Sequence, residues 1–246
     1  MNGLFVTGTD TDCGKTEVSL GLMLALQQRG LSVQGMKPVA SGCERRGEGL
    51  RSSDARRLAA QASREAPYRL VNPYAFAPPV APHIAAGPVG VDIELAVIRT
   101  CAEALAAQCD MLVVEGVGGW RVPLGPALFV SDLPRALGMP VVMVTALRLG
   151  CINHSLLTAD GIRSSGSRLA GWVANQVNPR MQVREENLAT LAALIDAPFL
   201  GLVPWMAAPE VREVAKRLSV DPLLKGRAGS SPADGSAGQQ GPHRPS

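Results

Sequence analysis

One segment near the N-terminus constrains the fold of this chain more than any other. Residues 3–16 open with the apolar run Leu4-Phe5-Val6, pass through a polar loop between Gly8 and Gly14, and end in Lys15-Thr16. A long apolar-periodic segment follows. The succession of strand, glycine loop, Lys-Thr and helix is typical of a phosphate-binding loop. Glycines let backbone N–H groups turn toward phosphate oxygens, and the helix N-terminus adds partial positive charge.

The spacing of this loop departs from the standard pattern. Five residues separate Gly8 from Gly14, so the loop is one residue longer than the usual form. A glycine-rich turn that only caps a helix is the alternative, but it would not explain the agreement of strand, Lys-Thr and helix. We expect Lys15 to reach the β- and γ-phosphates and Thr16 to hold Mg²⁺. Cys13 is interpreted as a small filler side chain, with a reactive thiol as the alternative.

Beyond the loop, short apolar strands alternate with helical segments. Strands are predicted at 4–6, 32–36, 111–114, 140–145, 169–174 and 199–203, and helices at 18–26, 55–62, 93–107, 150–163, 184–195 and 211–218. Residues 44–51 are predicted to form a polar loop, and the proline-rich residues 67–90 an extended segment without helix. This alternation predicts an α/β fold of the P-loop NTPase type, with a mostly parallel sheet covered by helices on both faces.

The ends of the predicted strands carry the polar residues of interest, because ligands of open α/β sheets bind at the carboxyl edge. Lys37 is either a solvated strand end or a second phosphate-facing cation, and the neighbouring Pro38 and Gly42 favour the second interpretation. As a strand-end lysine, it is expected to be replaceable without loss of folding.

Two acidic residues are candidate metal ligands. Glu115 ends an apolar strand and precedes the glycines at 116, 118 and 119, which is how phosphate-loop enzymes place a second Mg²⁺ ligand. Asp54 precedes a helical segment, so it is either a helix cap or a carboxylate directed at the same metal. The sequence alone leaves both interpretations of Asp54 open.

Bulk properties exclude several function classes. The chain has 246 residues and a formal net charge of +3, without a basic run interleaved with aromatics, so no nucleic-acid binding is expected. No apolar run reaches the ~18 residues of a membrane span, and because the N-terminus enters a strand at once, no signal peptide is expected. Five scattered cysteines favour a reducing cytoplasm. We expect one domain over residues 1–225 and a disordered tail over 226–246, where Val, Ile, Leu, Met and aromatics are lacking.

Several separate motifs in this order resemble the dethiobiotin synthetase family. They are Thr7-Gly8-Thr9-Asp10-Thr11 with Gly14-Lys15-Thr16, Lys37-Pro38-Val39-Ala40-Ser41-Gly42, Ser53-Asp54-Ala55, Asn72-Pro73-Tyr74, Pro82-His83, Glu115-Gly116 with Gly118-Gly119-Trp120, Leu149-Gly150-Cys151-Ile152-Asn153-His154 and Gly171-Trp172-Val173-Ala174-Asn175. The resemblance implies an ATP-dependent cyclo-ligase. It would join CO₂ to 7,8-diaminononanoate (7,8-diaminopelargonate) to give dethiobiotin, ADP and phosphate, through a carbamate and a carbamic–phosphoric anhydride.

The resemblance also implies a role for each matching residue. Lys37 and Lys15 would be catalytic, and Thr16, Asp54 and Glu115 would hold Mg²⁺. The diamine substrate would contact Thr11, Ser41 and, across a homodimer interface, Gly150, Cys151, Ile152 and Asn153. ATP would be bound by Asp12, Cys13, Gly14, Lys15, Thr16, Glu17, Glu115, Gly116, Gly118, Asn175, Gln176, Pro204 and Trp205.

Two positions depart from the family pattern. Gln176 stands where an aspartate is expected, and Asn187 where some members have an aromatic residue near the substrate tail. Two other protein classes fit the sequence less well. An amidase-type ligase related to cobyrinate a,c-diamide synthase usually carries a glutaminase domain, for which this chain leaves no room. A partitioning ATPase has a lysine five residues before Lys15, and here Asp10 occupies that position.

Overall fold

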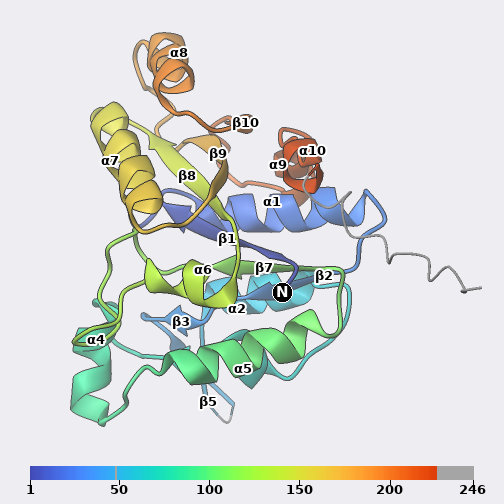
Figure 1. The fold of residues 1–246 in the computed structure, drawn as a ribbon, viewed down its shortest axis with the longest axis vertical. Helices are drawn as coiled ribbons and strands as arrows, with labels where there is room; N and C mark the ends of the chain where they lie inside the picture. The colour runs from blue at the N-terminus through green and yellow to red at the C-terminus, as the bar shows by residue number, and fades with distance from the viewer. Residues whose placement is uncertain (48, 226–246) are drawn as a thin grey trace, which may run out of the picture.

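Six parallel strands form the central sheet, in the order β10-β9-β8-β1-β7-β2 (Figure 1). The computed structural model describes residues 1–47 and 49–225, so the tail predicted over residues 226–246 lies outside the described residues. The strands are β1 (Gly3–Gly8), β2 (Val33–Met36), β7 (Met111–Glu115), β8 (Val141–Leu147), β9 (Leu169–Gln176) and β10 (Phe199–Val203). All five pairings between them are parallel. The predicted parallel α/β sheet is confirmed.

Helices cover both faces of this sheet, because its strands are apolar on both sides. Leu4 and Val6 of β1 pack into the core beneath α1 (Lys15–Gln27), α2 (Ser53–Gln61) and α9 (Val211–Ala215). Phe5, between them, points into the opposite core, beneath α5 (Leu95–Ala106), α6 (Asp132–Leu137) and α7 (Cys151–Ser164). Successive strand residues face opposite sides, so one buried strand serves both cores.

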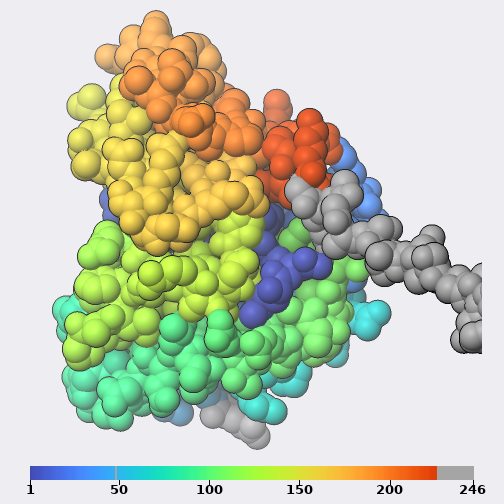
Figure 2. Space-filling model, in the orientation of Figure 1, coloured from blue at the N-terminus to red at the C-terminus, as the bar shows by residue number. Residues whose placement is uncertain are grey.

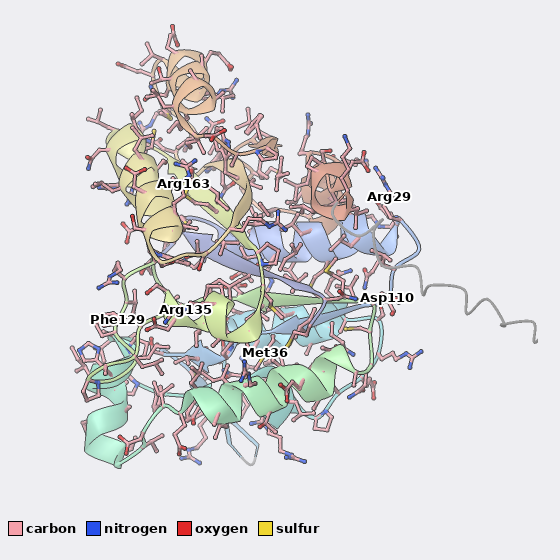
Figure 3. The ribbon with its side chains drawn as sticks, viewed as in Figure 1. Arg29, Met36, Asp110, Phe129, Arg135 and Arg163 are labelled. Atoms are coloured by element: carbon pink, nitrogen blue, oxygen red, sulfur yellow. The ribbon has the colours of Figure 1, made fainter. Side chains whose placement is uncertain are left out.

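Two further helices lie in the C-terminal part of the chain. Helix α8 (Arg184–Leu194) packs against α7 and lies at one end of the long axis of the molecule (Figure 2). Asp221 of helix α10 (Asp221–Leu224) forms an ion pair with Arg29, which follows α1 and is labelled in Figure 3. In the ranges 1–47 and 49–225, no helix has the length and apolar character needed to cross a membrane.

Two predictions for the connecting segments are wrong. The predicted polar loop contains an antiparallel hairpin of β4 (Glu44–Arg46) and β5 (Gly49–Arg51). The predicted extended segment contains two short α-helices, α3 (Tyr68–Val71) and α4 (Pro82–Ala86), and the 3₁₀ helix η1 (Gly87–Val89). Proline is compatible with these helices because Pro67 is the N-cap of α3 and Pro82 begins α4, where no N–H is needed.

Smaller differences from the prediction remain, among them helices α6 and α10, which were not predicted. The strands β3 (Val39–Ala40) and β6 (Tyr74–Ala75) form a short parallel pair that was not predicted. Helix α9 ends at Ala215 instead of residue 218, and the chain then turns so that the Ser219 N–H donates to the Leu200 carbonyl on β10.

Candidate active site

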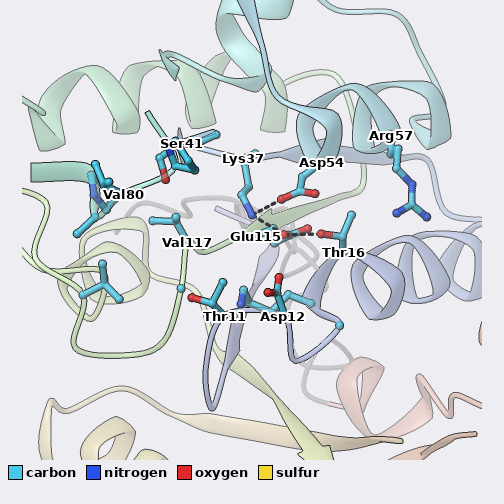
Figure 4. A pocket seen from close by; sticks show the side chains of 18 of the residues that line it. Thr11, Asp12, Thr16, Lys37, Ser41, Asp54, Arg57, Val80, Glu115 and Val117 are labelled. Atoms are coloured by element: carbon cyan, nitrogen blue, oxygen red, sulfur yellow. Dashed lines mark hydrogen bonds and ion pairs between the residues drawn. The ribbon is translucent and has the colours of Figure 1, made fainter. Parts of the chain in front are cut away.

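A pocket of about 840 Å³ opens where the carboxyl ends of β1, β2 and β7 meet (Figure 4). The parallel sheet brings these ends to one edge, so side chains far apart in sequence converge there. Many of the residues predicted from sequence line this pocket, namely Thr11, Asp12, Gly14, Lys15, Thr16, Glu17, Lys37, Ser41, Asp54, Glu115 and Gly118.

The phosphate loop joins β1 to α1, and Gly14 is its tightest position. Gly14 has a φ of 88°, in the left-handed region that favours glycine. A Cβ placed there would lie 1.9 Å from Nδ2 of Asn175, so the side chain of β9 touches the loop. The Lys15 ammonium donates a 2.8 Å hydrogen bond to the Asp10 carbonyl and therefore spans the mouth of the loop.

Cys13 lies beneath this loop and fills space. Its side chain is buried, and a Cβ on Gly8 would approach its Sγ to 2.2 Å. Glycine at position 8 is therefore needed for the thiol to pack against the end of β1. The filler interpretation of Cys13 fits this arrangement.

Lys37 is the centre of a polar cluster in the pocket. Its Nζ lies 2.6 Å from Oε1 of Glu115 and 2.9 Å from Oδ2 of Asp54. Thr16 Oγ1 donates to the same Glu115 oxygen at 2.9 Å (Figure 4). Lys37 is 4% exposed and Glu115 is 0% exposed, so Lys37 is not a solvated strand end.

The charges of this cluster support one another. Burial disfavours the charged form of Lys37, but the attraction of Glu115 and Asp54 outweighs it and raises the pKa of the ammonium. Burial likewise opposes ionisation of Asp54, yet Lys37 holds the pKa of that carboxyl below its usual value. Both groups are therefore charged at neutral pH.

Asp54 is free of the capping role that the sequence left open. Ser52 is the N-cap of α2, and its Oγ accepts from the Ala55 N–H at 3.3 Å. Asp54 lies in the first helical turn and directs its carboxylate at Lys37. The structure thus assigns the cap to Ser52 and brings Asp54 to Thr16 and Glu115, the other two predicted metal ligands.

These three residues fit a Mg²⁺ ion. They offer a hydroxyl and two carboxylates, the hard oxygen donors that Mg²⁺ prefers, and Mg²⁺ usually keeps water or phosphate oxygens besides one or two carboxylates. Among the residues that the structure describes, the buried Oε2 of Glu115 has no hydrogen-bond partner. A buried carboxylate oxygen requires a partner, and a cation would supply one.

The ends of β9 and β10 lie on the other side of the phosphate loop. Asn175 is buried and donates through Nδ2 to the Cys13 carbonyl at 2.9 Å. Gln176 donates to the Asn178 carbonyl and accepts from Arg184, so both ends of its amide are engaged within the protein. Pro204 and Trp205 follow β10, and Trp205 is exposed.

The predicted residues Gly150, Cys151, Ile152 and Asn153 do not line the pocket. They lie at the start of α7, preceded by Arg148, which forms an ion pair with Asp10 of the phosphate loop. Asn187 of α8 lies next to them, with its Oδ1 3.8 Å from the Cys151 thiol. Gly116 is buried and also does not line the pocket.

The sequence reasoning missed Arg57 of α2. Its guanidinium donates to both carboxylate oxygens of Glu17, at 2.5 and 2.7 Å, and both residues line the pocket. The signal was present, since Arg57 lies three residues after Asp54 and therefore on the same helix face. Apolar walls formed by Val80, Val117 and Val122 were also missed.

Known proteins match this chain over most of its length. The AAA domain family model matches residues 2–210. The ATP-dependent dethiobiotin synthetase BioD of Pseudomonas aeruginosa (strain UCBPP-PA14) is 50% identical over 224 residues, covering 91% of this chain and 98% of that protein. The protein of the same name from Aromatoleum aromaticum is 49% identical over 215 residues, covering 87% and 95%.

The chain belongs to the dethiobiotin synthetase family.

The family resemblance seen in the motifs is thus confirmed, and dethiobiotin synthetases are ligases. A solved structure of the signal recognition particle 54 kDa protein from Aeropyrum pernix K1, in complex with GDP, superimposes with a TM-score of 0.55. Its sequence identity is 13%, and the match covers 92% of this chain and 47% of that one. At that identity it shows the fold alone, which is the P-loop NTPase fold expected of a dethiobiotin synthetase.

Proposed function

We propose that this chain uses ATP and Mg²⁺ to join CO₂ to 7,8-diaminononanoate and close the ureido ring of dethiobiotin. The observation that carries the proposal is the Lys37 cluster. A buried ammonium, two carboxylates and the Thr16 hydroxyl meet in the pocket that also contains the phosphate loop. Family membership supports the overall reaction.

The proposed reaction proceeds in three steps. One substrate amine attacks CO₂ and loses a proton, which gives a carbamate. A carbamate oxygen attacks the γ-phosphorus, the bond from phosphorus to ADP breaks, and a carbamic–phosphoric anhydride forms. The second amine attacks the carbamate carbon, the bond from carbon to the phosphate oxygen breaks, and the ring closes with release of phosphate. The protein supplies no nucleophile of its own, so positioning and charge stabilisation are its tasks.

Lys15 and the loop N–H groups would bind the phosphates. Lys37 uses two ammonium hydrogens on Glu115 and Asp54, and its third hydrogen is available to an oxyanion in the pocket. We assign that hydrogen to the carbamate and γ-phosphate, whose mutual repulsion a cation reduces. When held by Thr16, Asp54 and Glu115, Mg²⁺ would neutralise charge on the β- and γ-phosphate oxygens.

The remaining site residues complete the proposal. Asn175 would read adenine, with Gln176, Pro204 and Trp205 beside the base, and Thr11 and Ser41 would contact the diamine. The start of α7 would bind the substrate carboxylate in a homodimer, because Gly150 and Asn153 do not line the pocket of their own chain. A cytoplasmic location fits the five free cysteines.

ADP release by the purified protein tests the proposal. We expect release only when the diamine, bicarbonate and Mg²⁺ are all present, together with dethiobiotin detected by mass spectrometry. Equal ATP hydrolysis without the diamine would contradict it. The anhydride has its own test, since the carbamate oxygen ends in phosphate. ¹⁸O-labelled CO₂ should therefore transfer label to phosphate, and unlabelled phosphate would exclude this intermediate.

A further inference from the structure

The ion pair between Arg57 and Glu17 joins the two helices that carry two of the three predicted metal ligands, Thr16 and Asp54. Glu17 follows Thr16 in the first turn of α1, and Arg57 lies one turn after Asp54 on α2. The guanidinium contacts both carboxylate oxygens, in the planar two-bond geometry that arginine forms with carboxylates. Both side chains line the pocket, so their charges act on any anion bound there.

The Glu17 carboxylate lies in an unfavourable place for an enzyme that binds a triphosphate. The first turn of α1 carries the partial positive charge that attracts phosphate, and an acidic side chain there competes for the same charge. It also repels the phosphates directly, and its side chain is only 21% exposed, so water screens it incompletely. A neutralising partner would remove both penalties.

We propose that Arg57 sets the nucleotide affinity of this site by neutralising Glu17 at the mouth of the phosphate pocket. Arg57 is a positioning residue in this scheme, because it acts through the Glu17 carboxylate. The inference rests on the proposed binding of ATP and extends it to Arg57, which is not among the residues expected to bind ATP or Mg²⁺. The alternative role for Arg57 is mechanical, as a tether that holds α1 and α2 together.

Equilibrium binding of Mg²⁺-ATP, measured by calorimetry without diamine or bicarbonate, tests this inference. Arg57→Met should weaken ATP binding about fivefold, the scale of one uncompensated charge near the surface. The loss should shrink as salt is raised from about 0.05 to about 0.5 M, because partly exposed charges are screened. Arg57→Lys should retain most of the affinity, since it keeps the charge.

A double variant separates the two roles of Arg57. Adding Glu17→Gln to Arg57→Met removes the uncompensated carboxylate, so ATP affinity should recover. If Arg57 acted as a tether, the double variant would still lack the ion pair between the helices. It would then bind ATP as weakly as Arg57→Met does. The matched control is Arg56→Met, which removes the same charge from the next position of α2, outside the pocket lining. Its ATP affinity should equal that of the wild type.

Several outcomes would overturn the inference. These are wild-type affinity in Arg57→Met, an equal loss in Arg56→Met, a loss independent of salt, or no recovery in the double variant. Thermal unfolding of each variant establishes that it is folded. The proposed reaction can fail separately, because a wild-type chain that binds ATP but releases no ADP with the diamine and bicarbonate would leave this inference standing. A wild-type chain that binds no ATP would overturn both.

Discussion

At the scale of single residues, Lys37 has two tasks that cannot be separated. Its ammonium offers a hydrogen to the pocket and also compensates the fully buried Glu115 carboxylate. Removing it leaves that carboxylate in a medium of low polarity without its cation, which costs more than an ordinary surface change. The expectation that Lys37 can be replaced without loss of folding assumed a solvated strand end, and the buried, paired lysine removes that basis.

We predict that Lys37→Ala lowers kcat about a hundredfold or more, the effect of removing one group that stabilises a charged transition state. It should also lower the free energy of unfolding by about 3 kcal/mol, because a buried charge loses its partner. Steady-state kinetics and urea unfolding measure the two effects. Lys216→Ala is the control, since Lys216 forms an ion pair with Glu213 on the surface. Near-wild-type kcat in Lys37→Ala would remove Lys37 from the mechanism.

The lowered pKa of Asp54 predicts that the stability of the fold depends on pH. Lys37 lowers the folded-state pKa of Asp54 below its ordinary value of 3.8, so its ionised form stabilises the fold above pH 3.8. This contribution is lost as the pH falls through the folded-state pKa. Asp54→Asn should therefore be less stable than the wild type at pH 7, and the difference should narrow below pH 3.8. Urea unfolding at a series of pH values measures the difference in unfolding free energy between the two proteins. A difference that stays constant with pH would contradict this prediction.

At the scale of elements, the contact between Gly14 and Asn175 joins the phosphate loop to β9. Gly14→Ala should strain the left-handed backbone and also drive a methyl group into the Asn175 amide, 1.9 Å away. Gly30→Ala is a matched control, because Gly30 has a φ of 81° but no atom within 4 Å of an added Cβ. The control should cost about 1 kcal/mol of unfolding free energy. Gly14→Ala should lower the free energy of unfolding by more than Gly30→Ala does, and it should also weaken ATP binding. Equal effects of the two substitutions would show that the contact with Asn175 does not matter.

The same contact predicts which base the site prefers. Nδ2 of Asn175 donates to the Cys13 carbonyl, which can only accept, so the amide orientation is fixed. In the proposed role of Asn175, its carbonyl oxygen is the group left to accept from the base, which suits the exocyclic amine of adenine and not the oxo group of guanine. We expect ATP to bind about tenfold more tightly than GTP, the order of one well-placed hydrogen bond. Competition binding measures the ratio of the ATP and GTP affinities. Asn175→Ala should abolish the preference for ATP.

The large elements were predictable because buried parallel strands are continuous apolar runs, and β7 is one of them. The hairpin β4–β5 was not, because Glu44–Arg46 is exposed and charged and shows no alternation. Similarly, the proline at the start of α4 conceals a helix when it is interpreted only as a helix breaker. The local sequence pattern thus predicts those elements whose residues are buried with a regular periodicity.

The candidate site was predictable where chemistry follows directly from topology. Lys37 and Glu115 come at strand ends, and parallel strands bring such ends together. Arg57 and Glu17 could not be paired from sequence, because their contact depends on which face α2 turns toward α1. The link from Asn175 to Cys13 spans 162 positions and depends on strand order. These contacts arise from tertiary packing, which the sequence pattern does not specify.

At the scale of the whole molecule, two exposed leucines, one just before α7 and one on it, flank the residues proposed to bind substrate across a dimer. Leu149 is fully exposed, and Leu157 is 64% exposed and lies one turn beyond Asn153 on the same face. We predict a homodimer that Leu157→Glu dissociates, with loss of activity at dilutions where the dimer separates. Val97→Glu, at a 39% exposed position of α5, is the control. Analytical ultracentrifugation reports the mass, and a fully active monomer would refute the shared site.

The central position of β1 has a consequence for how the chain folds during synthesis. Its partners β7 and β8 begin at residues 111 and 141, so β1 stays unpaired until β7 has been synthesised. At about 5–20 residues per second, an apolar strand then waits for seconds with both edges open. Such distant pairing slows folding and exposes the nascent chain to aggregation. Overproduction of this protein should therefore depend on translation rate and on chaperones that bind short apolar segments.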